Sequence, residues 1–515
     1  MDYTMKWPDG RIFPTFGTPA DPMDAVVSIT MSRDEQLALS CLQGIVNKTR
    51  PRILMLDAET DEGAYTWPQT MGINFTESDF LSIFAKYAKE ASGAVLYSEA
   101  KSTHYVNLAC TAAAVNGAVA MTPAVYNYLL KNGITLSVVE DLCPLKMSTR
   151  KEIYEYLYDT YWERCTHRLI ISQPTNEAFH MRDLCTAAGC AMVFLENRKE
   201  EERLVYEKFL ADMEPGNAIA MGWYTEERSG ITTATAFGLS TVPADHFCNP
   251  TVYAQDKPIH LKELRDAPDP ENKIYAALFV SDGDNIQYNE RFMRGFWDKN
   301  ASDRGQTCIN WTISPALVDV APDIMNYYYD TATDKDCFVC GPSGLGYAMP
   351  VNTLDEEIEA KNYVRDDNNF AKYVALSNRY LERAGLRVVT IWDNLTPNQR
   401  DIYVKNAPYL HGLTVQMFTE DWESITSENG GKLIKQLTPC YCTTVEHFTK
   451  VLTREIGKWD QKAPMFIACQ FSVWGNITVA SVGEMEKQFK EMTDGRFEFV
   501  RADDFFRMYD KTKKQ

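Results

Sequence analysis

Two aspartates, Asp282 and Asp284, are separated by a single glycine in the run Ser281-Asp-Gly-Asp-Asn285. This run directly follows the apolar stretch 274–280. Carboxyl groups at the end of a buried strand can act as general acid, general base or nucleophile, and they can bind Ca²⁺ or Mg²⁺ through oxygen. The same run is a common turn sequence, in which Asp side chains bond the backbone. Taken alone, it therefore does not predict an active site.

Polar or aromatic residues follow five more apolar stretches in the second half of the chain. Carboxylates and amides bond sugar hydroxyls, and aromatic faces pack on sugar rings, so this mixture favours a carbohydrate substrate. Cleavage of a glycosidic bond typically needs two carboxyl groups, one protonated and one ionised. We predict that Asp282 or Asp284 is one of them. We predict that Asp393 or Glu420 is the other.

The remaining polar and aromatic candidates would bind and orient the sugar. They are Asn285, Trp311, Ser343, Gly344, Gly346, Tyr347, Trp392, Gln470 and Trp474. A single tryptophan is more often part of a core than of a binding site. The prediction therefore depends on the recurrence of such residues over six strand ends, and on no single motif.

Two other functions fit the same residues. A carbohydrate-binding protein without catalysis would keep the aromatic and amide groups. A metal-dependent hydrolase, such as a deacetylase, would hold a divalent cation at Asp282 and Asp284, whereas the leading hypothesis uses no metal or other cofactor. No two of the seven histidines lie within five residues of each other. The sequence therefore does not favour a His-rich zinc site, although a distant pair could converge.

Short apolar stretches alternate with helical ones in the second half, which predicts parallel βαβ units. The expected strands are 274–280, 308–313, 337–340, 386–392, 412–417, 464–469 and 497–500, with 437–442 as a weaker candidate. Seven or eight strands over about 240 residues is the size of one (β/α) barrel. In such a barrel the loops after the strands converge on one face, so the candidate residues would meet there.

The first half shows a similar alternation. Its expected strands are 52–56, 94–97, 118–121, 135–139, 168–172, 191–195 and 218–221, and its expected helices include 33–47, 151–166 and 176–188. Ser32 is the predicted cap of the first of these helices. The fold class is therefore α/β. We expect an N-terminal α/β region of two or three small subdomains over 1–255, a Pro-containing linker over 256–272, and a barrel-like catalytic domain over 273–515.

The charge of the chain bears on its partners. The 515 residues carry 52 basic and 71 acidic side chains, a formal net charge of −19, which disfavours nucleic acid and anionic membranes as partners. No apolar run approaches ~18 residues, so no membrane span is expected. The first ten residues lack the apolar stretch of a signal peptide, and the 13 cysteines are scattered, which together favour a cytoplasmic location with reduced thiols. The oligomeric state is not predicted.

One heptapeptide resembles a family signature. Gly344-Leu-Gly346-Tyr347-Ala-Met349-Pro350 is similar to the motif that names the GxGYxYP family of putative glycoside hydrolases, with Met349 in place of the second aromatic residue. The stretches 42–47, 281–285 and 311–315 are similar to the family as well. The resemblance implies an N-terminal α/β region in several parts, a barrel-like C-terminal domain and hydrolase activity. It supplies no catalytic residues.

Overall fold

The computed structural model describes residues 4–352, 363–416, 425–426 and 432–513. The chain divides into two compact units. The first comprises Met1–Pro258 with Ala316–Tyr327, and the second comprises Ile259–Pro315 with Tyr328–Gln515. Within the described residues, the helices are too short or too polar to span a bilayer.

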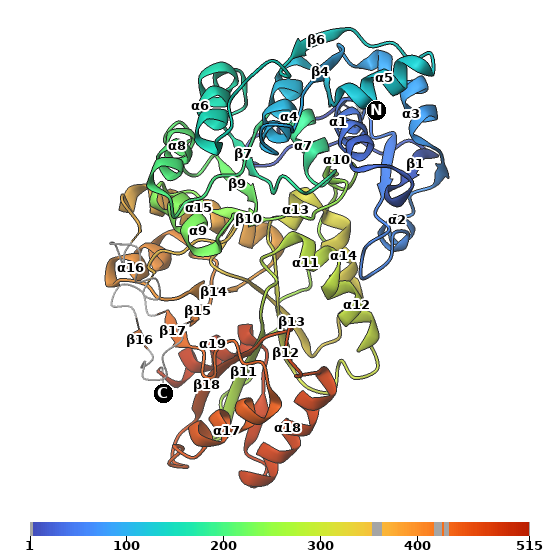
Figure 1. The fold of residues 1–515 in the computed structure, drawn as a ribbon. Helices are drawn as coiled ribbons and strands as arrows, with labels where there is room; N and C mark the ends of the chain where they lie inside the picture. Colours follow the sequence, from blue (N-terminus) through green and yellow to red (C-terminus); the bar gives the residue numbers. More distant parts are fainter. Residues whose placement is uncertain (1–3, 353–362, 417–424, 427–431, 514–515) are drawn as a thin grey trace. The chain divides into compact units, whose positions relative to one another are not determined.

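The first unit builds three parallel sheets from its described residues, as expected for several small α/β parts (Figure 1). The strand orders are β2-β1-β3, β5-β4-β6 and β10-β9-β7-β8. The strands are β1 Met23–Val27, β2 Ile53–Leu56, β3 Phe75–Glu77, β4 Ala94–Leu96, β5 Val119–Met121, β6 Val138–Asp141, β7 Leu169–Ser172, β8 Ala191–Val193, β9 Ile219–Gly222 and β10 Thr241–Pro243.

Helices connect these strands, as parallel pairing requires. They are α1 Arg33–Thr49, α2 Thr66–Thr70, α3 Phe80–Tyr87, α4 Tyr105–Asn116, α5 Pro123–Lys131, α6 Arg150–Tyr161, α7 Arg182–Ala188, α8 Glu200–Ala211 and α9 Glu227–Ala236. The helices α10 Pro250–Tyr253 and α13 Leu317–Val320 follow the last strand of this unit, and α14 Pro322–Thr331 begins in it. Ser32 caps α1 as predicted and forms a capping box with Glu35.

Helix α7 differs from its prediction. A helix was expected over 176–188, but it begins only at Arg182, because Met181 before it adopts a left-handed conformation (φ 64°) that a helix cannot contain. The residues before Met181 form a loop. The guanidinium group of Arg182 donates hydrogen bonds to the carbonyls of Glu177 (2.8 Å) and Ala178 (3.0 Å), which satisfies backbone groups that a helix would have paired.

The second unit contains the expected barrel-like sheet. Its parallel strands follow the order β17-β15-β14-β13-β12-β11-β18, and β19 pairs with the start of β11. Bridges from Leu437 to Ala468 and from Cys442 to Phe471 bring the two ends of this sheet together, so it nearly closes. The strands are β11 Ile274–Val280, β12 Ile309–Ile313, β13 Asp336–Cys340, β14 Val388–Trp392, β15 Gly412–Gln416, β17 Leu433–Gln436, β18 Met465–Phe471 and β19 Phe497–Phe499, with β16 Ile425–Thr426 antiparallel to β17.

The expected strand over 437–442 is replaced by β17, which lies four residues earlier. The sequence of β17, Leu-Ile-Lys-Gln, is short and half polar, so it carries little apolar signal. The helices of this unit are α11 Ile286–Glu290, α12 Phe292–Lys299, α15 Asp367–Ala384, α16 Pro397–Asn406, α17 Val445–Ile456, α18 Val479–Met492 and α19 Ala502–Thr512.

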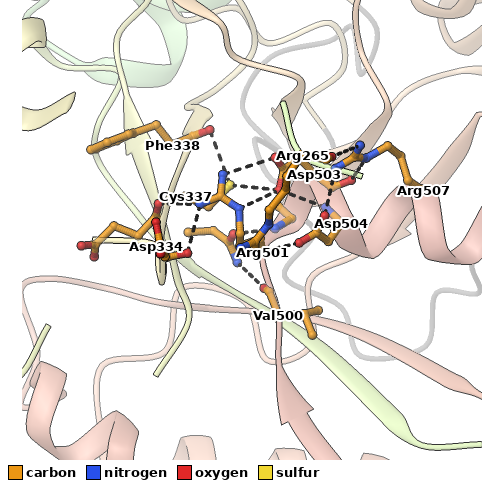
Figure 2. Close-up of polar contacts among 12 residues, drawn as sticks. Arg265, Asp334, Cys337, Phe338, Val500, Arg501, Asp503, Asp504 and Arg507 are labelled. Carbon is orange, nitrogen blue, oxygen red and sulfur yellow. Dashed lines mark hydrogen bonds and ion pairs between the residues drawn. The ribbon is translucent and has the colours of Figure 1, made fainter. Parts of the chain in front are cut away.

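A cluster of charged side chains lies beside Asp336, the first residue of β13 (Figure 2). Arg501 pairs with Asp503 (3.2 Å) and donates to the carbonyl of Asp336 (2.8 Å). Asp504 pairs with Arg265 of the predicted linker (2.9 Å) and with Arg507 (2.8 Å). A cavity of about 130 Å³ lies here beside the first residues of β13 and β14. It is at the opposite end from the candidate residues, so we do not assign it to the active site.

Candidate active site

The run after β11 crosses the ends of two neighbouring strands. The amide of Gly283 donates to Thr312 Oγ1 of β12 (2.8 Å), and a Cβ at Gly283 would lie 1.8 Å from the carbonyl oxygen of Thr312. A Cβ at Gly341, directly after β13, would lie 2.8 Å from the amide nitrogen of Asp284. Glycine at both positions therefore lets the backbone carry Asp282 and Asp284 over the mouth of the barrel.

Asp282 lies in a polar setting made by distant parts of the chain. Its backbone is left-handed (φ 71°), and its two carboxylate oxygens accept hydrogen bonds from the hydroxyl of Tyr441 at 3.1 and 3.2 Å. Ser281 Oγ and the side chain of Trp474 also bond this carboxylate. Burial raises the pKa of Asp282, and the hydrogen bonds from Ser281, Trp474 and Tyr441 partly oppose that rise.

Tyr441 was missed by the sequence prediction. The run Cys440-Tyr-Cys442 was interpreted as strand packing, but Tyr441 has a left-handed backbone (φ 48°) and turns its hydroxyl to Asp282. Gln470, a predicted site residue in β18, accepts a hydrogen bond from the Tyr441 amide through Oε1 (3.2 Å). The sequence carried little signal for Tyr441, because the strand that precedes it, β17, was not predicted and Tyr441 lay inside the expected strand 437–442.

A buried hydroxyl lies beside this carboxylate. Tyr288 is 4 % exposed, and its hydroxyl has no hydrogen-bond partner among the described residues. Burial is the main cause that raises the pKa of Tyr288, and the charges of Asp282 and Tyr441 add to it. Asn285 caps α11 by accepting from the Tyr288 amide (3.1 Å), so this predicted sugar ligand holds Tyr288 in place.

An exposed aromatic ring borders the same position. Trp474 is 57 % exposed, and it packs on Phe292 with ring centroids 4.7 Å apart. Two further buried polar atoms at strand ends, Ser314 Oγ after β12 and Gln416 Oε1 in β15, have no partner in the described part of the chain. Buried polar groups normally have partners, so a bound ligand or water would complete them.

The glycine-rich loop after β13 is mostly structural. Ser343 is fully buried, and its hydroxyl donates to the carbonyl of Ala348 (2.7 Å). Gly344 and Gly346 have positive φ angles of 154° and 77°, which favour glycine. The carbonyl of Gly346 accepts from the hydroxyl of Tyr373 in α15 (3.2 Å). This loop therefore shapes the strand end through its backbone.

A second group of candidates lies after β13 and β14. The rings of Tyr347 and Trp392 meet edge to face at 5.7 Å. Asp393 follows Trp392 with a left-handed backbone (φ 60°) and is 2 % exposed. Asp284 lies close to this group, because its backbone and Cβ pack against Gly341. Burial is the main cause that raises the pKa of Cys340, and the negative charge of Asp284 adds to it.

The structure does not bring every candidate to the strand ends. Trp311 is fully buried and donates through Nε1 to Asp336 (2.8 Å), so it belongs to the core. Glu420 lies outside the described residues. Asp282 and Asp284 belong to no group of three metal-ligating side chains in the described ranges. The assembled arrangement offers a carboxyl group of raised pKa, hydroxyl donors and an exposed ring.

Models of one family match three consecutive regions of the chain. The GxGYxYP_N second domain matches residues 91–165, the GxGYxYP third domain matches 167–255, and the GxGYxYP putative glycoside hydrolase C-terminal domain matches 272–510. The chain belongs to the GxGYxYP family. The candidate residues described above lie in the C-terminal GxGYxYP domain, which includes the heptapeptide at 344–350.

A solved structure shares the fold of this GxGYxYP protein. A putative hydrolase from Bacteroides thetaiotaomicron VPI-5482 is 19% identical to it, with a TM-score of 0.76 over 98% of this chain and 97% of that chain. The likeness therefore includes both the N-terminal α/β parts and the barrel-like sheet.

Two further solved structures match only part of the chain. A PuuE allantoinase is 11% identical over 50% of this chain and all of its own, with a TM-score of 0.32. A probable polysaccharide deacetylase from Pseudomonas aeruginosa PAO1 is 11% identical over 46% of this chain and 91% of its own, with a TM-score of 0.31. TM-scores this low do not define a shared fold. No curated protein matches the chain.

Proposed function

We propose that this GxGYxYP protein hydrolyses a glycosidic bond at the strand ends of its barrel, with Asp282 as the general acid. The observation that carries the proposal is the setting of Asp282, a half-buried carboxyl group of raised pKa beside the exposed ring of Trp474. A general acid must be protonated when the substrate binds, and burial favours the protonated carboxyl group.

Tyr441 would orient this acid. Its hydroxyl lies within hydrogen-bonding distance of both Asp282 oxygens, so it restricts rotation of the carboxyl group and favours one direction of proton transfer. The buried hydroxyl of Tyr288 would bond a sugar hydroxyl, because it has no partner in the described part of the chain. The exposed face of Trp474 would pack against the sugar ring.

A second carboxyl group would act as nucleophile or base. Asp284 and Asp393 are the described candidates, and Glu420 remains a candidate from the sequence. Retaining enzymes place their two carboxyl groups about 5–5.5 Å apart, and inverting enzymes about 6.5–9.5 Å apart. The anomer released first, followed by NMR, would therefore report which spacing the enzyme uses.

The test is a screen of natural and chromogenic glycosides with and without EDTA. Once a substrate is found, Asp282→Asn should lower kcat by about 10²–10⁴-fold, because the amide cannot donate a carboxyl proton. Asp269→Asn is the matched control, since Asp269 is an exposed aspartate paired with Lys511 away from the strand ends. Full turnover in the Asp282→Asn variant would exclude the proposed role of Asp282.

The same screen separates the other two functions. Saturable glycan binding without product in any condition would indicate a carbohydrate-binding protein. Turnover of an acetylated glycan that EDTA abolishes would indicate a metal-dependent deacetylase. Cleavage of a glycoside that survives EDTA supports the proposed mechanism.

A further inference from the structure

Three metal-ligating side chains of the first unit converge at the ends of parallel strands. Glu177 and His180 lie in the loop after β7, and His246 follows β10 by three residues. One ligand atom from each of the three lies within 4.8 Å of the other two. Ligands in open α/β sheets bind beyond the carboxyl ends of the strands, which is where this group lies.

The two imidazoles face the same carboxylate oxygen. Glu177 Oε2 is 2.9 Å from His180 Nδ1 and 3.2 Å from His246 Nδ1. The two rings meet edge to face with centroids 5.5 Å apart. Two nitrogen atoms and one oxygen atom therefore point to one small volume.

The opposite nitrogen of each imidazole faces another carboxylate. His180 Nε2 lies 3.1 Å from Asp57 Oδ2, and His246 Nε2 lies 3.6 Å from Asp245 Oδ2. Metal-binding histidines typically donate their second ring N–H to a carboxylate, which fixes the tautomer and leaves the other nitrogen to the metal. Asp57 is itself held, because its Oδ1 accepts from the Glu59 amide (3.1 Å).

Charge also favours a cation here. A neutral imidazole has one N–H and one lone pair, so His180, with a carboxylate on each side, cannot donate to both. Three carboxylates, Glu177, Asp57 and Asp245, surround the two imidazoles, and a divalent ion would offset their negative charge.

The loops that carry these side chains are fixed by other contacts. The fully buried guanidinium group of Arg182 bonds the carbonyls of Glu177 and Ala178, and Gln173 Nε2 donates to the carbonyl of Asp245 (2.8 Å). The three ligands therefore stand close together before any ion binds, and a preformed site loses less conformational entropy on binding.

We propose that Glu177, His180 and His246 bind one divalent transition-metal ion of the zinc class, with Asp57 and Asp245 orienting the two imidazoles. Two imidazole nitrogens and one carboxylate oxygen form a ligand set of zinc sites that keep a fourth position open for water or substrate. The nitrogen ligands disfavour Mg²⁺ and Ca²⁺, which prefer oxygen. The site is independent of the proposed glycosidase function, because no residue of the barrel takes part.

The test uses the full chain, stripped with EDTA and titrated with Zn²⁺ by calorimetry. The native chain should bind one equivalent, and Glu177→Gln and His246→Ala should each weaken binding by about 100-fold. With Co²⁺ as the probe, the native chain should show visible absorption bands that both variants lose. Asp57→Asn should weaken Zn²⁺ binding by about 10–100-fold through the orientation of His180.

Two controls keep the result interpretable. His260→Ala removes an exposed histidine of the second unit that pairs with Asp330, and it should bind Zn²⁺ as the native chain does. His246 is 43 % exposed in its side chain, so its replacement should leave the metal-free melting temperature unchanged, which excludes misfolding as the cause of lost binding.

Two outcomes would overturn the proposal. One is a native chain that binds Zn²⁺ no more tightly than about 10 μM. The other is Zn²⁺ binding that persists in both Glu177→Gln and His246→Ala. If Asp282→Asn then abolished that binding, the ion would lie in the barrel. The first outcome leaves the glycosidase proposal as it stands, whereas an ion at Asp282 would favour the metal-dependent hydrolase. Glycoside cleavage is measured separately, on the native chain and on Asp282→Asn, with and without EDTA.

Discussion

The contact between Asp282 and Tyr441 joins residues 159 positions apart in the chain. Asp282 could be proposed from the sequence because it lies two residues after the end of an apolar strand. Tyr441 could not, because its orientation depends on the left-handed backbone at that position and on the bond from its amide to Gln470. Local sequence patterns predict where a side chain stands along the chain, and they carry little information about which distant side chain it meets.

Removing the Tyr441 hydroxyl should change the pH dependence of turnover. The hydrogen bond from Tyr441 lowers the pKa of Asp282, so Tyr441→Phe should raise that pKa further. A general acid is active when protonated, so the alkaline limb of the kcat profile should move to higher pH. Tyr65→Phe is the matched control, because it removes a tyrosine–carboxylate bond (2.8 Å to Glu77) far along the chain. An unmoved alkaline limb would show that Asp282 is not the acid.

Asp183 should make stability depend on pH. Burial raises the pKa of Asp183 to about 6, and Thr251 bonds its carboxylate through Oγ1 (2.6 Å). The folded state therefore binds a proton that the unfolded state releases near pH 4, so this contribution to stability is full below that pH and is lost as pH rises to about 6. A shift of about two pKa units corresponds to ~3 kcal/mol.

The measurement is the free energy of unfolding from pH 4 to pH 7, in the native chain and in Asp183→Asn. The amide does not ionise, so the difference between the two should shift in favour of the variant by up to ~3 kcal/mol over this range. The difference in the free energy of unfolding between Asp183→Asn and the native chain at pH 4 serves as the baseline, because it contains the effects of the amide that do not depend on pH. A difference that stays constant with pH would mean that Asp183 titrates normally in the folded protein.

At the scale of elements, apolar periodicity located most of the barrel. Strand β11 has the bounds that the sequence predicts, and β12 to β15 begin within two residues of theirs. Strand β17 and the start of α7 were mispredicted, because each depends on backbone geometry and pairing more than on its own residues. The loop that replaces the first turns of the expected helix carries Glu177 and His180, so this local error concealed the candidate metal site.

Gly283 should be intolerant of any side chain. A Cβ at this position would lie 1.8 Å from the carbonyl oxygen of Thr312, so Gly283→Ala must push the run 281–285 off β12. We expect a loss of more than ~2 kcal/mol in the free energy of unfolding, measured by urea denaturation, together with loss of turnover.

Gly295→Ala is the control for Gly283→Ala. Gly295 lies inside α12, and no other atom lies within 4 Å of the position that a Cβ would take, so alanine there should stabilise the protein by about 0.5–1 kcal/mol. Equal effects of the two substitutions would contradict the close approach of Gly283 to β12.

At the scale of the molecule, the segment Ala316–Tyr327 belongs to the first unit although it lies inside the range expected for the C-terminal domain. Within the first unit, Asp319 pairs with Arg11 (3.7 Å) and Asp323 pairs with Lys257 (2.6 Å). Asn326 also donates to the carbonyl of Pro258 (3.0 Å). These contacts join parts of the chain that are about 60 to 300 residues apart, so no local pattern predicts them.

A fragment of residues 273–515 should therefore aggregate when it is produced alone. It would contain Ala316–Tyr327 without Arg11, Lys257 or Pro258, and the buried apolar residues Leu317 and Val318 would lose their surroundings. We expect low soluble yield and aggregation by size-exclusion chromatography with light scattering, in contrast to the full chain. A monomeric fragment that melts as cooperatively as the full chain would show that these contacts are dispensable.

The sequence by itself determined the α/β class, the position of the barrel and the place of Asp282 at a strand end, because each of these follows from local periodicity. The tertiary structure alone decided that Tyr441 and Tyr288 surround Asp282 and that His180 meets His246 across 66 positions of sequence. It also decided that Trp311 lies in the core. The reason is physical: such meetings depend on strand order and on left-handed backbone positions, and neither is encoded in the residues that meet.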